Sequence, residues 1–162
     1  MVSNRPSLQS PIDTELVNDG GRPLNRAERS LLAGWSLVLV AGFLMARGLE
    51  PDPRGYGTHE QFGLPACTFL ETSGLPCPSC GMTTSFAYLA RGRLVDAARA
   101  NLAGCALAIV CAAQIPWAWF SILRGRLWLV RRLDAWFVWT VTGLTLVAAV
   151  HWIWRILAGA SG

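Results

Sequence analysis

The sequence predicts an all-α integral membrane protein with three transmembrane helices and a short re-entrant or interfacial helix. Hydrophobic residues make up 52% of the 162 residues, and the mean hydropathy of +0.37 is too high for an ordinary soluble domain of this size. Three apolar segments are also long enough to cross a bilayer, at about residues 31–47, 102–123 and 135–157. Arginine or tryptophan borders each segment, as is typical of helices that end at membrane interfaces.

The N-terminal region and the arginines predict how the chain is organised across the membrane. Residues 1–25 are polar and contain several prolines and glycines, so we expect a disordered cytoplasmic tail before a single membrane domain at residues 26–162. Arginines gather before the first span and between the second and third spans, and the positive-inside rule assigns both regions to the cytoplasm. Because the net charge of +4 is spread over span ends, no nucleic-acid partner is expected.

The connection between the first two spans faces outward in this topology, and it contains a cysteine-motif loop and helix at residues 59–92. Within it, residues 76–90 are apolar but too short for a full crossing, and they carry several serines and threonines. We therefore expect this segment to be a re-entrant or interfacial helix rather than a fourth span.

The centre of this connection reads LPCPSCGMTTSF, and its proline predicts where the short helix begins. Pro78 suits the first helical position, which makes Cys77 the N-cap of a helix over residues 78–91. Cys77 and Cys80 would then lie in the first turn, where unpaired N–H groups favour a thiolate. Gly81 would let another backbone approach closely, and Thr83, Thr84 and Ser85 could satisfy backbone carbonyls or bind a neighbouring helix.

Three cysteines of the outward connection, Cys67, Cys77 and Cys80, are expected to form one cluster, because Gly74 and Pro76 allow the chain to reverse between them. The spacing is compatible with zinc or another thiophilic metal. A disulfide, a redox-active Cys77–Cys80 pair and simple packing at a helix entry are alternatives that the sequence leaves open. His59 could add a fourth metal ligand, although its spacing is loose.

The cysteine motif also resembles a known family. The residues that carry the resemblance are Cys67-Thr68-Phe69, the stretch from Thr72 to Thr83, and Leu89, Gly92, Ala97 and Asn101. They are similar to the bacterial membrane family called domain of unknown function 2752 (DUF2752). The resemblance implies a small multi-span protein of the bacterial cytoplasmic (inner) membrane, and it gives no reaction. The chain departs from the family pattern at Thr68 and Leu102, where proline is usual, and at Thr84, where arginine is usual.

The sequence contains no recognisable catalytic set. Nucleotide-binding and zinc-hydrolase motifs are missing, and no serine–histidine–acid combination stands out. We therefore expect a non-enzymatic structural or accessory component of a membrane assembly, in contact with the lipid bilayer and with a membrane protein partner or a second copy of itself. The alternative is a membrane thiol redox or metal-handling protein that uses Cys77 and Cys80.

Overall fold

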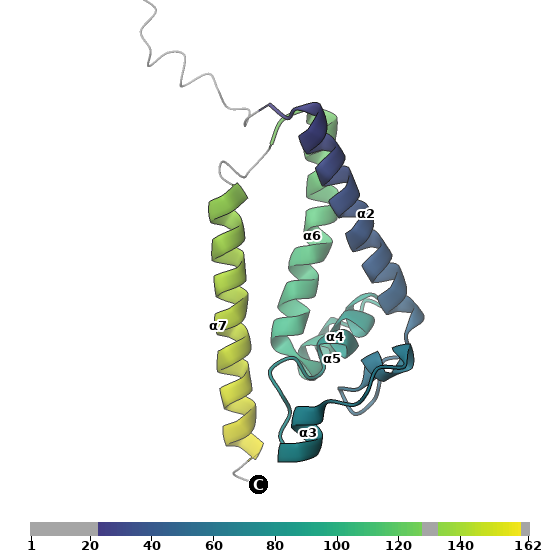
Figure 1. Cartoon of the computed structure of the whole chain (residues 1–162), viewed down its shortest axis with the longest axis vertical. Helices are drawn as coiled ribbons and strands as arrows, with labels where there is room; N and C mark the ends of the chain where they lie inside the picture. The colour runs from purple at the N-terminus through teal and green to yellow at the C-terminus, as the bar shows by residue number, and fades with distance from the viewer. Residues whose placement is uncertain (1–22, 128–132, 160–162) are drawn as a thin grey trace, which may run out of the picture.

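The computed structural model describes residues 23–127 and 133–159, and these residues are helical with no β-strand (Figure 1). In chain order the elements are α2 (Arg26–Gly48), the 3₁₀ helix η1 (Thr58–Phe62), α3 (Thr68–Ser73), α4 (Met82–Leu89), α5 (Leu94–Ala100), α6 (Leu102–Arg124) and α7 (Leu133–Gly159). The predicted all-α class is confirmed.

Three long helices, α2, α6 and α7, run between two ends of the molecule (Figure 1). The start of α2, the end of α6 and the start of α7 lie at one end, and α3, α4 and α5 lie at the other. The cysteine motif is therefore at the end opposite the N-terminal entry to α2. This is the relative arrangement that the arginine pattern predicts, whichever end faces the cytoplasm.

Two helices, α2 and α6, are long and apolar enough to cross a membrane. The apolar stretch within α7, Val138–Trp154, is shorter, so the third predicted span is not confirmed. Only 11% of the most apolar part of α2 and 17% of that of α6 are buried inside the protein. Large side chains such as Leu31 (73% exposed) and Leu44 (66% exposed) instead point away from it.

Helix α2 begins with a capping box. The Asn25 side chain accepts a hydrogen bond from the Glu28 N–H at 2.8 Å, and the Glu28 carboxylate accepts one from the Asn25 N–H at 2.9 Å. Just before this cap, Pro23 pairs with Arg126 in an isolated antiparallel bridge, and Leu24 is buried. Residues 23–25, the end of the predicted disordered tail, therefore belong to the fold, whereas residues 1–22 lie outside the described part of the chain.

Polar side chains connect α2 to α6 and to the end of α4. Midway along both helices, the Trp35 indole donates to the Gln114 side-chain oxygen at 2.8 Å, which links α2 to α6. At the motif end, Arg47 of α2 donates to the Ala90 carbonyl at 2.9 Å, and Arg91 donates to the Ala46 carbonyl at 3.3 Å. Arg47 thus binds a carbonyl at the end of α4, and Arg91 binds a carbonyl at the end of α2. Carbonyls at the end of a helix have no partner within that helix.

Candidate three-cysteine site

The cysteine pair lies in a turn before α4, and the prediction of a helix over residues 78–91 is wrong at its start. The Cys80 N–H bonds the Cys77 carbonyl at 3.1 Å, and the Met82 N–H bonds the Ser79 carbonyl at 3.0 Å, so the backbone makes two tight turns. Gly81 then adopts a left-handed conformation (φ +87°) and caps α4, which begins at Met82. A left-handed residue cannot continue a right-handed helix, so Pro78 starts a turn instead.

Asn101 holds this turn from the far side of α5. Its side-chain N–H₂ donates to the carbonyl oxygens of Pro78 (3.1 Å) and Cys80 (3.0 Å), and its side-chain oxygen accepts from the Gly104 N–H (2.8 Å). The residue is fully buried, so these bonds are shielded from water. The conformation of the cysteine turn is therefore fixed by an amide side chain and does not depend on a disulfide.

Gly81 permits the close backbone approach that its position predicts. A Cβ atom added there would lie 2.5 Å from the Gly55 carbonyl oxygen and 2.6 Å from the Ala100 carbonyl oxygen. Only glycine fits such a gap, and only glycine adopts this φ without strain. The turn is thereby pressed between the loop after α2 and the end of α5.

The buried hydroxyl residues of α4 anchor the helix to neighbouring segments of the chain. Ser85 donates to the Ala97 carbonyl at 2.8 Å, and the Thr84 hydroxyl lies 2.8 Å from that of Thr58, with all three side chains buried. Thr83 lines the pocket described below and is half-buried. Of the three hydroxyl residues singled out in the sequence, Thr84 and Ser85 therefore make the buried bonds, and Ser85 satisfies a backbone carbonyl as expected.

The sulfur atoms of Cys67, Cys77 and Cys80 all lie within 4.8 Å of one another, and all three cysteines are free thiols. The Cys77 and Cys80 sulfurs are 3.1 Å apart. Cys67 reaches them from the N-cap of α3, because Gly74 ends that helix in a left-handed conformation and turns the chain back. In a tetrahedral zinc–thiolate site the sulfurs are about 3.8 Å apart, so this spacing suits a metal after small side-chain adjustments.

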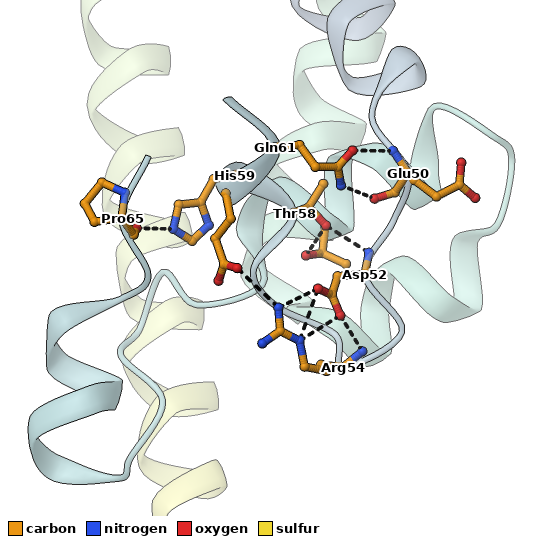
Figure 2. Close-up of polar contacts among 9 residues, drawn as sticks. Glu50, Asp52, Arg54, Thr58, His59, Gln61 and Pro65 are labelled. Atoms are coloured by element: carbon orange, nitrogen blue, oxygen red, sulfur yellow. Dashed lines mark hydrogen bonds and ion pairs between the residues drawn. The ribbon is translucent and has the colours of Figure 1, made fainter. Parts of the chain in front are cut away.

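The three sulfurs face a cavity of about 520 Å³. His59 lines the same cavity, and its Nε2 lies 3.2 Å from the Pro65 carbonyl oxygen (Figure 2). Since a carbonyl can only accept, Nε2 must carry the proton, and in the neutral ring Nδ1 then keeps a lone pair. Histidines that bind metals are oriented by such a backbone bond to the second ring nitrogen.

The loop that carries His59 is held by a polar network that the sequence did not reveal (Figure 2). Arg54 forms an ion pair with Asp52 at 2.7 Å and a longer one with Glu60 at 3.4 Å. The hydrogen bonds from Arg54 lower the pKa of Asp52. The Thr58 hydroxyl accepts from the Asp52 N–H at 3.0 Å, and its bond to Thr84 ties the loop to α4. The paired glycines around Tyr56 were the available sequence signal for this compact turn.

The two thiols of the Cys-x-x-Cys pair differ in acidity. Burial opposes ionisation of Cys77, but hydrogen bonds from Ser79, Cys80 and Cys67 outweigh it and lower the pKa of Cys77 to about 7. Burial is also the main reason that the pKa of Cys80 is raised to about 12, and the hydrogen bond to Cys77 adds to it. One thiol is thus ready to ionise near neutral pH while its neighbour keeps its proton.

The comparison with protein families agrees with the resemblance seen in the sequence. The model described as "Protein of unknown function (DUF2752)" matches residues 67–115. This chain carries a DUF2752 segment. The segment begins at Cys67, contains the whole cysteine turn and Asn101, and ends within α6. It covers under a third of the chain. No curated protein and no solved structure is similar enough to count as a match.

The bounds of the DUF2752 segment coincide with the parts that build the site. It includes the three sulfurs, the turn and the amide that fixes the turn, whereas His59 and the Arg54 network lie before it. The three cysteines of the thiol cluster therefore lie within the matched residues, whereas the loop over residues 50–65 lies outside them.

Proposed function

We propose that this chain is a membrane-embedded, non-enzymatic protein whose three cysteines bind a thiophilic metal ion, zinc or a softer ion such as Cu(I). The observation that carries the proposal is the convergence of the Cys67, Cys77 and Cys80 sulfurs within 4.8 Å from two separate parts of the chain. Thiolate ligands select soft and borderline metals. The low pKa of Cys77 eases the deprotonation that metal binding requires.

The rigid support of the turn favours a ligand-binding role for the cysteines over a metal or disulfide that only holds the fold together. Asn101 and Gly81 already fix the backbone around Cys77 and Cys80, so neither a metal nor a disulfide is needed to hold it. A preformed turn lowers the ordering cost of binding and leaves the thiols available to a ligand. His59 lines the same cavity but lies outside the sulfur cluster; it is the proposed fourth ligand after a ring rotation that gives up its present bond to the Pro65 carbonyl.

Metal content measures this proposal directly. The protein, purified in mild detergent and loaded with Zn²⁺ or Cu(I), should hold one ion per chain by elemental mass spectrometry. The metal content should fall to a small fraction of one ion per chain in each of the variants Cys67→Ser, Cys77→Ser and Cys80→Ser. Cys111→Ser is the matched control, because Cys111 lies on α6 outside the cluster. Equal metal content in all four variants would contradict the proposal.

The proposal also includes a membrane topology. The exposed apolar faces of α2 and α6 support insertion, and the arginine distribution supports a cytoplasmic N-terminus in the bacterial inner membrane, with the cysteines on the opposite face. A membrane-impermeant maleimide should label Cys77 in intact cells after metal removal. Labelling only after permeabilisation would reverse the orientation.

An accessory role in a membrane assembly completes the proposal. It is supported by the absence of a recognisable catalytic set and by the exposed apolar helix faces, which a partner or second copy could cover. Cross-linking in native membranes, followed by mild-detergent purification, should recover a larger complex. Recovery of the cross-linked chain as a monomer alone would count against it.

A second candidate, thiol redox exchange, is favoured by the 3.1 Å separation of the Cys77 and Cys80 sulfurs. Here the Cys77 thiolate attacks a disulfide of a partner protein and releases one partner thiol. Cys80 loses its proton and attacks the Cys77 sulfur, which releases the second thiol and leaves a Cys77–Cys80 disulfide. The chain is oxidised by two electrons and the partner is reduced by two. Cys67→Ser separates the candidates, because it should abolish metal binding but keep this exchange.

A further inference from the structure

A second cavity, of about 1110 Å³, opens between the α5–α6 corner and α7. Its walls are mainly aliphatic and include Leu94, Val95, Leu102, Leu146, Val147 and Val150. Several of these side chains are strongly exposed, among them Val95 (62%) and Val150 (66%). This groove is separate from the cysteine cavity, with which it shares no lining residue.

Arg99 and His151 are the basic side chains that line this groove, and Arg99 differs from the other arginines at the motif end. Arg47 and Arg91 bond to carbonyls, Arg54 pairs with Asp52, and Arg93 pairs with Asp96 at 2.8 Å. Arg99 is exposed, and within residues 23–127 and 133–159 it makes no hydrogen bond or ion pair. The groove therefore combines an apolar trough with an unneutralised guanidinium.

In the membrane topology proposed above, the groove lies near the headgroup level, because it opens beside the start of α6. Trp154 also lines it, and the neighbouring Trp152 indole donates to the Pro76 carbonyl at 2.8 Å, next to the cysteine turn. Tryptophans are enriched at membrane interfaces, and arginine reaches from apolar surroundings to phosphate groups there. An arginine binds phosphate through two parallel N–H bonds, which makes it more selective than a point charge.

We propose that the groove binds one anionic phospholipid, with an acyl chain along the aliphatic walls and the phosphate on Arg99. A net negative headgroup fits because Arg99 lacks a carboxylate partner, and Asp96 on the same helix is already taken by Arg93. A zwitterionic lipid brings its own ammonium group and gains less from the guanidinium. This inference rests on the membrane insertion proposed above and is independent of the metal site.

Lipid binding to the full chain in detergent tests the inference. Native mass spectrometry would compare phosphatidylglycerol with phosphatidylcholine of the same acyl chains. Phosphatidylglycerol should bind the wild type more tightly, and Arg99→Gln should weaken it about tenfold, which corresponds to roughly 1.4 kcal/mol. Arg26→Gln is the matched control, since Arg26 is exposed at the start of α2, pairs with no carboxylate among the described residues and does not line the groove. It should leave phosphatidylglycerol binding unchanged.

Two further arms separate the groove from other sources of binding. Val147→Trp should fill the trough and weaken both lipids, with Ala98→Trp as a substitute if that variant does not fold. Glycerol phosphate, which has the headgroup anion but no acyl chain, should fail to compete. Equal losses in Arg99→Gln and Arg26→Gln would mean annular lipid only, and competition by glycerol phosphate would mean a simple anion site. Either result overturns the inference, whereas extraction of the protein from membranes by carbonate would instead overturn the proposed insertion.

Discussion

Asn101 Nδ2 lies 3.0 Å from the Cys80 carbonyl oxygen, so the residue that caps α6 also holds the cysteine turn. Asn101→Ala should remove both functions and lower the free energy of unfolding by roughly 2–4 kcal/mol, because a helix cap is lost and two carbonyls lose their donor. Denaturation in detergent measures this loss. The alkylation rate of Cys80 should rise at the same time, because the turn loosens.

Asn101→Asp is the matched variant for this prediction. An aspartate keeps the oxygen that accepts from the Gly104 N–H but removes both donors to the turn. It should therefore preserve the start of α6 and still expose Cys80 to alkylation. Wild-type alkylation of Cys80 in both variants would show that the turn is held by something other than this amide.

Gly81→Ala should prevent stable folding of the motif end. The added Cβ would meet the carbonyl oxygens of Gly55 and Ala100, in addition to the strain of a left-handed alanine. We expect a loss of roughly 3 kcal/mol or more in the free energy of unfolding. Gly92→Ala is the comparison, because Gly92 has a similar φ of +75° but nothing within 4 Å of an added Cβ. It should lose about 1–2 kcal/mol. Equal losses would refute the close approach at Gly81.

Alkylation of Cys77 in the metal-free protein should follow a titration near neutral pH. Because its pKa is lowered to about 7, the thiolate fraction, and with it the iodoacetamide rate, should rise as pH increases through 7. Cys80, with a pKa of about 12, should stay nearly unreactive up to pH 9. Peptide mass spectrometry resolves the two sites.

The bond from Ser79, 3.3 Å from the Cys77 sulfur, is the strongest lowering influence on that thiol. Ser79→Ala should therefore move the midpoint of the Cys77 rate profile to higher pH. Ser73→Ala is the control, since the Ser73 hydroxyl bonds the Phe69 carbonyl within α3. An unchanged midpoint in Ser79→Ala would remove the physical basis for the acidic thiol.

Trp152→Phe should loosen α7 from the cysteine loop. It keeps an aromatic ring but deletes the donor to the Pro76 carbonyl, for an expected loss of about 1 kcal/mol in the free energy of unfolding. Trp139→Phe, on a side chain of α7 that is 75% exposed, should change stability much less. Hydrogen exchange of the α7 backbone would report the difference, and equal exchange in both variants would argue against this contact.

The long helices could be predicted from the sequence because their signal is local. Apolar runs bordered by arginine and tryptophan predict α2 and α6, and they also placed α7 within a few residues. The apolar stretch of α7 is shorter, so composition alone does not establish that α7 crosses the bilayer. The clustering of the three cysteines was predictable for a similar reason, since Gly74 is the residue that reverses the chain between them.

The start of α4 could not be predicted from neighbouring residues. Pro78 suits a helix start, but the carbonyls it would direct into the helix are held by Asn101, which lies 21 residues beyond Cys80. The left-handed Gly81 is likewise selected by contacts with Gly55 and Ala100. The same limit applies to the loop around His59, where Thr58 bonds Thr84 across 26 residues. Distant contacts decide these conformations, and local propensity does not.

The pairing of Leu24 N–H with the Gly125 carbonyl, at 2.9 Å, closes the chain on itself just outside α2 and α6. Everything that builds the cysteine site lies inside this closed circuit, and α7 lies outside it. Unfolding that starts at either end of this closed segment must break the bond between Leu24 and Gly125. The start of α2 and the end of α6 therefore gain and lose order together. The thiol site is therefore coupled to the ends of α2 and α6 through one backbone bond, and to α7 through a separate contact, the Trp152 hydrogen bond to the Pro76 carbonyl.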